Sequence, residues 1–234
     1  MPQHSFFCEE LKDGVIRLSP DESRHAAKVL RLEAGESVSL FDGNGVSADA
    51  TILSVSRRGD EVACRVSGLV RHERHPVELR LYLAPPRAKV MDLAVRFATE
   101  LGVSRITPVL CRYGVSKPDG NKESWRQTAI VACKQSRNPW LPLLDSPVSF
   151  ADALDLSSEF PVVGMVPRRG RTVVPPEAEH CIGLWIGPEG GFAPEEEDAL
   201  LEHGAFPMTV GPCILRVETA VPALIGALYS MVRI

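Results

Sequence analysis

The sequence lacks the features that mark membrane, secreted or metal-dependent proteins. No apolar run approaches the roughly 20 residues that a membrane-spanning helix needs. The first residues, MPQHSFFCEELKDG, have no basic segment followed by an apolar core, so no secretory signal is expected. The six cysteines are scattered and form no CxxC pair, which argues against a zinc site or a disulfide framework. We therefore expect a cytoplasmic protein with reduced thiols in or near its cores, no metal and no membrane partner.

The usual nucleotide-binding motifs are also missing. Neither the GxGxxG fingerprint nor a glycine-rich loop followed by Gly-Lys-Ser/Thr occurs. The sequence has instead two glycine-rich turns, IGPEGGF at 186–192 and GPCILRVETA at 211–220, each preceded by an apolar run and about one helix apart. Glycines leave the backbone unobstructed, so these turns predict a small ligand held between two loops.

The charge of the chain is unevenly distributed. The composition, with 44% hydrophobic and 24% charged residues, is that of an ordinary globular protein, and the net charge is −4. Residues 1–137 carry a net charge of +4, whereas residues 138–234 carry −8. This asymmetry fits a protein that meets a polyanion with one part only, although charges also cluster by chance in a chain of this size.

The first seventy residues read as short strands around one helix. Asp42-Gly43-Asn44-Gly45 between two alternating runs is a strong hairpin signal. A helix is predicted from Pro20 to just before Gly35, with Ala26, Val29 and Leu30 facing a core. Arg24, Lys28 and Arg31 would then form one basic stripe at i, i+4 and i+7. The stripe suits contacts to phosphates on the outside of a small barrel; the alternative is a solvated helix face.

After a polar boundary at 71–78, the pattern changes to alternating strands and helices. Strands are predicted over 78–86, 105–110, 140–144, 160–166, 180–187 and 206–211, and helices over 90–102, 121–136, 149–156, 194–203 and 219–233. This rhythm predicts an α/β layer fold that binds ligands at the carboxyl ends of its strands. Basic residues gather where strands or helices end and predict an edge that faces a polyanion, the alternative being a solvated rim: Arg87, Lys89, Arg112, Lys117, Arg137, Arg168, Arg169 and Arg171.

The last predicted helix is apolar on almost every side. We expect it to be buried within its domain or against another subunit. Pro222 is compatible with its first turn if Thr219 is the N-cap, because first-turn N–H groups have no acceptor within the helix.

Several separated segments, in order, resemble one family. IGPEGGF with the glutamates that follow it, then GPCILRVETA, are similar to the signature of the RsmE family of 16S rRNA methyltransferases. The segments HAAKVLRLEAGESVSLFDGNG (25–45), KVMDLAVRFATELGVSRITPVL (89–110) and ACKQSRNPWLP (132–142) resemble other parts of the same family. The match to RYGVSKPDG (112–120) is loose, and Val217 and Val221-Pro222 depart from the family pattern.

The resemblance implies a fold and a partner set. The fold class would be α/β knotted, a SPOUT methyltransferase domain with a trefoil knot over residues 77–234, preceded by a PUA-like RNA-binding barrel over residues 1–72. The chain would bind S-adenosyl-L-methionine, form a homodimer and act on N3 of a uridine in 16S rRNA of the small ribosomal subunit. The cofactor-binding residues implied are Val166, Pro167, Ile186, Gly187, Pro188, Glu189, Gly190, Gly191, Gly211, Ile214, Leu215 and Thr219.

The same resemblance puts Arg216, Glu218 and Thr219 beside the transferred methyl group. Uracil N3 carries a proton, which must leave before N3 becomes a good nucleophile. Glu218 is the candidate proton acceptor or a partner that orients Arg216, and Arg216 is the candidate to stabilise the uracil anion or grip a phosphate. Alternatively, the two residues pair with each other as a structural brace. A non-catalytic RNA-binding or ribosome-assembly factor and a SPOUT methyltransferase acting on another RNA are the alternative functions.

Overall fold

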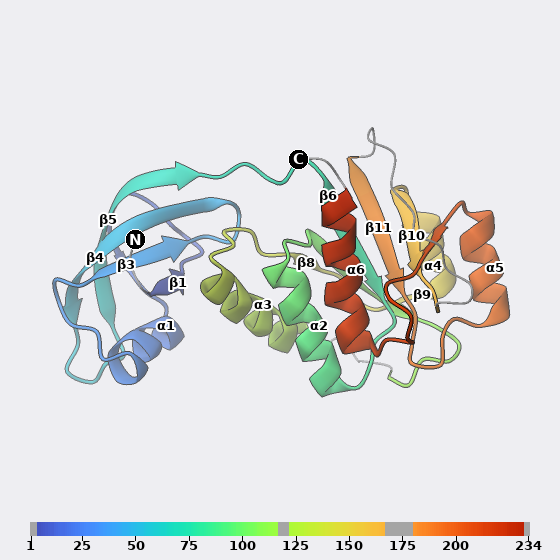
Figure 1. The fold of residues 1–234 in the computed structure, drawn as a ribbon. Helices are drawn as coiled ribbons and strands as arrows, with labels where there is room; N and C mark the ends of the chain where they lie inside the picture. The colour runs from blue at the N-terminus through green and yellow to red at the C-terminus, as the bar shows by residue number, and fades with distance from the viewer. Residues whose placement is uncertain (1–3, 117–121, 167–179, 232–234) are drawn as a thin grey trace. The chain divides into compact units, whose positions relative to one another are not determined.

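The computed structural model describes residues 4–116, 122–166 and 180–231 and divides the chain into two compact units (Figure 1). Unit 1 comprises residues 1–74 together with residues 130–141. Unit 2 comprises residues 75–129 and 142–234. Within the described ranges, no helix combines the length and the apolar character that crossing a bilayer requires.

Unit 1 is built on a five-stranded sheet with the order β1-β3-β4-β5-β2. Its strands are β1 (Ser5–Phe7), β2 (Gly14–Arg17), β3 (Ser37–Phe41), β4 (Val46–Val55) and β5 (Val62–Arg71). Neighbouring strands run antiparallel except for the parallel pair β1 and β3. The predicted hairpin at 42–45 is present between β3 and β4, where the Asp42 N–H donates to the Val46 carbonyl at 3.0 Å. Side chains such as Leu40, Ile52 and Cys64 alternate inward and form a fully buried core.

The long helix predicted from Pro20 is wrong. The chain forms α1 (Pro20–Arg24) and then a π-helical turn, η1 (His25–Val29), in which the Leu30 N–H donates to the His25 carbonyl at 3.0 Å. The wider π turn rotates each following residue away from its α-helical position, so Val29 is 66% exposed instead of facing the core. Arg31 then takes a left-handed conformation with φ 56°, which ends the helical path. The predicted stripe is therefore shorter, because Arg31 is not on the helix.

The segment 139–141 joins the tip of the β3–β4 hairpin. The Gly45 N–H donates to the Pro139 carbonyl at 3.0 Å, and Asn44 forms a bridge with Trp140. A Cβ on Gly45 would lie 2.1 Å from the Trp140 ring, so only glycine allows this approach. The end of α3 (Lys122–Ser136) is fixed in the same unit by the ion pair between Lys134 Nζ and Glu22 Oε2 at 2.6 Å. These contacts explain why residues 130–141 belong to unit 1.

Unit 2 is built on a parallel sheet with the order β12-β10-β11-β6-β7-β8, and β9 pairs with β7. Its strands are β6 (Glu78–Leu83), β7 (Arg105–Leu110), β8 (Leu143–Leu144), β9 (Val148–Ser149), β10 (Phe160–Gly164), β11 (Cys181–Ile186) and β12 (Phe206–Met208). The α/β layer prediction is confirmed, and the apolar run at 180–187 forms the interior strand β11. The strands predicted over 140–144 and 206–211 are only two and three residues long.

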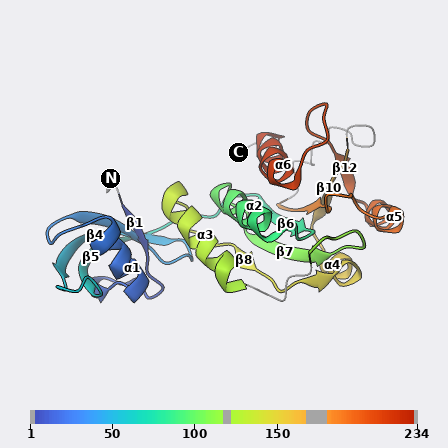
Figure 2. The ribbon, with the colours of Figure 1, turned by 90° about the horizontal axis from the view of Figure 1, so that it is seen from below.

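Helices cover both faces of this sheet. They are α2 (Ala88–Glu100), α4 (Phe150–Leu156), α5 (Pro194–Glu202) and α6 (Val217–Met231). Helices α2 and α6 pack against each other on one face, as both views show (Figures 1 and 2). On the other face, Ala153 of α4 and Leu200 of α5 share a core with Tyr82 and Trp185, whose rings stack with centroids 4.3 Å apart.

Helix α6 differs from its prediction in two respects. It begins at Val217, so Thr219 is not the N-cap, and Pro222 lies inside the helix rather than in its first turn. One face is buried, through Val217, Val221, Leu224, Ile225 and Leu228. The other face is not covered within unit 2, since Gly226 and Ser230 are exposed. Of the two predicted alternatives, burial within its own domain accounts for one face of the helix, and burial of the other face against a second subunit stays a prediction.

The six cysteines are free thiols. Burial raises the pKa of Cys111 and of Cys133 to about 12, so both stay protonated at neutral pH and are poor nucleophiles. Cys213 is exposed, against the expectation that all thiols lie in or near cores. Among the described residues there is no group of three or more side chains arranged to hold a metal ion.

Candidate functional site

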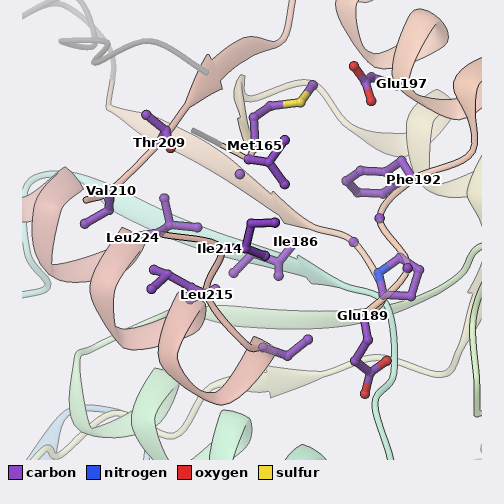
Figure 3. Close-up of a pocket in the computed structure, with 18 of the residues that line it drawn as sticks. Met165, Ile186, Glu189, Phe192, Glu197, Thr209, Val210, Ile214, Leu215 and Leu224 are labelled. Carbon is purple, nitrogen blue, oxygen red and sulfur yellow. The ribbon is translucent and has the colours of Figure 1, made fainter. Parts of the chain in front are cut away.

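A cavity of about 280 Å³ lies in unit 2 at the carboxyl ends of β10, β11 and β12 (Figure 3). Because these strands are parallel neighbours, the loops that follow them emerge at the same edge of the sheet. The lining comes from three loops with the strand ends before them, from α5 and from the first half of α6: Gly164, Met165, Val166, Ile186, Gly187, Pro188, Glu189, Gly190, Gly191, Phe192, Glu197, Thr209, Val210, Cys213, Ile214, Leu215, Val217, Ala220 and Leu224. The two glycine-rich turns singled out in the sequence therefore both border one cavity.

The first turn is closely packed around its glycines. A Cβ on Gly187 would lie 3.0 Å from the Phe192 ring and 3.2 Å from the Phe192 backbone nitrogen. The Gly191 N–H donates to the Pro188 carbonyl at 2.8 Å, and Gly191 has a φ of 79°, which favours glycine. Ala193, where the turn meets α5, is fully buried. This wall of the cavity is thus fixed by contacts within the protein.

The second turn has few such contacts. Gly211, with a φ of 74°, and the next three residues are exposed, and 76% of the Ile214 surface is open to solvent. An aliphatic side chain that lines a cavity and remains so exposed gains free energy if an apolar part of a ligand covers it. Leu215 is half-buried, and Val217 is the first residue after the turn to be fully packed.

The lining is mainly apolar, with two carboxylates. In Figure 3 the side chains of Glu189 and Glu197 lie on either side of Phe192, and Met165, Ile186 and Ile214 lie beside them. The apolar lining suits a flat or aliphatic part of a ligand, and the exposed carboxylate of Glu189 suits a positive charge. The Thr209 hydroxyl and backbone groups of the glycine turns are further sources of hydrogen bonds.

Nine of the residues predicted to bind a cofactor line the cavity: Val166, Ile186, Gly187, Pro188, Glu189, Gly190, Gly191, Ile214 and Leu215. Gly211 and Thr219 do not, and Pro167 lies outside the described residues. The prediction missed most of the other cavity walls. Val217, Ala220 and Leu224 recur at i, i+3 and i+7, a spacing that the sequence offered as a sign of one helix face.

The two candidate catalytic residues stand at the junction of the second turn and α6. Arg216 is exposed, and Glu218, in the first turn of α6, is partly exposed. Neither lines the cavity, although Leu215 and Val217, which flank Arg216, both do. Across the described ranges Arg216 and Glu218 form no ion pair with each other, which removes the proposed structural brace.

Among the described residues, the basic side chains predicted to bind RNA are exposed, and they occur in both units. Unit 1 contains Arg24, Lys28, Arg31 and Arg137; unit 2 contains Arg87, Lys89 and Arg112. Arg24 pairs with Asp21, and Arg112 pairs with Glu195 at 3.1 Å. Lys117, Arg168, Arg169 and Arg171 lie outside the described residues.

Comparison with known proteins first defines the class. The family model of an RNA methyltransferase domain matches residues 73–229, and that of an RNA methyltransferase PUA domain matches residues 18–62. The fold and site are thus those of an RNA methyltransferase with a PUA domain and an α/β catalytic domain.

Full-length relatives then define the family. The chain is 30% identical to ribosomal RNA small subunit methyltransferase E of Aquifex aeolicus over 97% of this chain and 99% of the relative. It is 29% identical to the protein of that name from Mycobacterium tuberculosis, over 95% of this chain and 89% of the other. The chain belongs to the ribosomal RNA small subunit methyltransferase E family.

Two solved structures cover 98% of this chain and 98% of their own. A Legionella pneumophila protein described as a methyltransferase, in complex with S-adenosylmethionine, has a TM-score of 0.89 and 29% identity. Ribosomal RNA small subunit methyltransferase E of Neisseria gonorrhoeae, bound to S-adenosylmethionine, has a TM-score of 0.88 and 26% identity.

Proposed function

We propose that this chain transfers a methyl group from S-adenosyl-L-methionine to N3 of a uridine in 16S rRNA of the small ribosomal subunit. The observation that carries the proposal is the cavity between the two glycine turns, in a chain similar along its length to methyltransferases solved with this cofactor. Such a substrate implies that the protein works in the cytoplasm.

The cavity suits the chemistry of the cofactor. S-adenosylmethionine carries a flat adenine, a positive sulfonium and a positive amino group, and it supplies the methyl group as an electrophile when bound. The apolar lining around Ile186, Phe192 and Leu215 fits the flat ring, and the carboxylates of Glu189 and Glu197 fit the positive charges. We also propose that unit 2 has the deep trefoil knot of SPOUT methyltransferases and that unit 1 is a PUA-like barrel.

The reacting groups of the chain would lie just beyond the second turn. Glu218 accepts the N3 proton of the uracil, and Arg216 stabilises the negative charge that develops on the uracil oxygens. Two features support these roles: both side chains are open to an incoming substrate, and both adjoin residues that line the cavity.

The RNA would dock through exposed basic residues. Arg24, Lys28, Arg31 and Arg137 on unit 1 contact phosphates, and so do Arg87, Lys89 and Arg112 on unit 2. Replacing Arg24, Lys28 and Arg31 by alanine should weaken RNA binding and reduce the slope of log affinity against log salt by up to about 2 to 3. Binding of S-adenosylmethionine should be unchanged. An unaltered salt slope would show that these residues do not contact phosphate.

The homodimer would form through the uncovered face of α6. This face presents small or weakly polar residues, with Gly226 and Ser230 exposed and Ala223 and Ala227 half-buried. Apart from its chain neighbours and the backbone of α6 itself, no described heavy atom lies within 4 Å of a Cβ built on Gly226, so a second copy can approach the backbone closely. A monomer in light scattering at working concentration would contradict this part of the proposal.

The function itself is tested on ribosomal RNA. Mass mapping of 16S rRNA from a strain that lacks the protein should reveal one uridine that has lost a methyl group. The purified protein with S-adenosylmethionine should restore it on small subunits from that strain. If the protein binds the cofactor but changes no nucleotide of 16S rRNA, the substrate is another RNA. If the protein binds no S-adenosylmethionine, the result contradicts the methyltransferase proposal and supports the alternative of a non-catalytic ribosome-assembly factor.

A further inference from the structure

One carboxylate beside the cavity ties two loops together. Glu196, in the first turn of α5, accepts the Ala193 N–H through Oε2 at 2.9 Å and the Arg112 N–H through Oε1 at 2.8 Å. The Arg112 guanidinium adds a hydrogen bond to Glu195 Oε1 at 3.1 Å. The loop that follows β7 is therefore fastened to the end of the 187–193 loop that lines the cavity.

The fastened segment presents an aromatic ring to solvent. The Gly114 N–H donates to the Cys111 carbonyl at 3.0 Å and closes a tight turn, and Cys111 itself is buried in the core. Tyr113 lies within this turn with 47% of its surface exposed. Its Cβ is 3.6 Å from the position that a Cβ would take on Gly190, a cavity-lining residue. Throughout the described ranges its hydroxyl has no hydrogen-bond partner.

A fixed, uncovered aromatic ring is a surface for stacking. Unpaired RNA bases stack on aromatic side chains, and an enzyme that modifies a base inside a folded RNA must take it out of its stack. Stacking covers one face of the base and leaves its edge, including N3, free to point towards the reacting groups.

We propose that Tyr113 is the stacking surface for the nucleobase that is methylated and that Glu196 is the positioning residue that holds it at the rim of the cavity. This inference rests on the proposed function, since it takes RNA as the substrate and the cavity as the site of the methyl donor. Through stacking, Tyr113 would contribute to binding of the target base and would not contribute to binding of S-adenosylmethionine.

The first experiment measures methylation of small ribosomal subunits from a strain that lacks the protein. Loss of one base–aromatic stack lowers affinity by about 5-fold to 150-fold, so Tyr113→Ala should lower kcat/KM for subunits by that range. Tyr113→Phe should restore it to within about 2-fold of wild type, and Tyr113→Leu should not, because leucine has no π face. The affinity for S-adenosylmethionine should not change in any variant. Val115→Ala, which alters an exposed aliphatic side chain nearby (57% exposed), is the matched control.

Glu196 is tested by its coupling to Tyr113. The two backbone N–H groups bond to different oxygens of the Glu196 carboxylate, and in Glu196→Gln one of these oxygens is replaced by an NH2 group that can only donate. It should raise KM for subunits, and adding it to Tyr113→Ala should cost less than the sum of the two separate effects. Additive losses would mean that Glu196 does not act through Tyr113.

A binding cycle keeps the stacking inference separate from the methylation claim. The probe is a short single-stranded oligoribonucleotide with one uridine, compared with the same strand carrying an abasic site there. Loss of the base should weaken binding by wild type and by Tyr113→Phe, but not by Tyr113→Ala. Equal losses in all three proteins would overturn the stacking role, whatever the enzyme methylates. Normal stacking with no methylation of 16S rRNA would instead overturn only the proposed substrate.

Discussion

The two turns that border the cavity are built in opposite ways. The first, residues 187–193, is closed by the Gly191 to Pro188 hydrogen bond, packs Gly187 against Phe192 and ends at a fully buried Ala193. The second, residues 211–216, is largely exposed and turns Ile214 out to solvent. The first turn is held by contacts within the protein, whereas the second has few such contacts. We infer that the first turn sets cofactor fit and that the second brings the reacting residues to the substrate.

The sharpest test of this division is Glu218→Gln. A glutamine keeps the size of the side chain but cannot accept a proton, so the methylation rate should fall by about a hundred-fold to ten-thousand-fold. Affinity for S-adenosylmethionine should stay within about 2-fold of wild type, because Glu218 does not line the cavity. Single-turnover methylation of small subunits and calorimetry with the cofactor measure the two quantities.

Glu189→Gln is the matched control for Glu218→Gln. It makes the same chemical change on the first turn and should act mainly on cofactor affinity, because Glu189 lines the cavity. A rate near wild type for Glu218→Gln would show that another group receives the N3 proton.

The next largest effect, a loss of cofactor affinity, is expected from a larger side chain at Gly187 in the first turn. Gly187→Val places methyl groups against the Phe192 ring and backbone, where even one Cβ is tightly accommodated. Overpacking of this kind costs about 1 to 3 kcal/mol, which corresponds to a 5-fold to 150-fold loss of cofactor affinity if the strain is relieved only by opening the cavity. Calorimetry with S-adenosylmethionine measures the loss.

Gly211→Ala gives the comparison on the second turn. Apart from its chain neighbours, nothing described lies within 4 Å of a Cβ at Gly211, so the main cost is the left-handed backbone, about 1 to 2 kcal/mol. Because this turn is exposed, much of that strain can relax without opening the cavity. Equal losses in the two variants would contradict the idea that only the first turn is preformed.

Local patterns predicted the elements of unit 2 well. The apolar run at 180–187 indicated a strand covered on both faces, and β11 lies between β10 and β6 with Leu184 and Trp185 buried. The sequence does not state which strands pair. Strand β6 pairs with β11, which comes about a hundred residues later in the chain. Such pairing depends on how whole layers bury their surfaces, and not on residues that are close in sequence.

Unit 1 shows where local rules failed. The helical spacing after Pro20 is real, but the chain widens into a π turn at His25–Val29 and leaves the helix at Arg31. Leu32, only 7% exposed, is directed into the core of the unit by that break. Burial of this leucine is a tertiary contact, so periodicity alone could not reveal it. The association of Trp140 with the glycine of the β3–β4 hairpin was hidden for the same reason.

The smallest expected effect tests whether a ligand completes the second turn. Ile214→Ala should leave the thermal unfolding midpoint nearly unchanged, because 76% of the side chain is already exposed. If S-adenosylmethionine covers this side chain, removing its methyl and methylene groups should cost about 1 kcal/mol of binding, roughly 5-fold in affinity. Leu156→Ala, at an aliphatic residue that is 70% exposed at the end of α4, should change neither quantity. Cofactor affinity equal to wild type in Ile214→Ala would mean that the second turn stays open over the bound cofactor, and its apolar surface would then be available to the RNA instead.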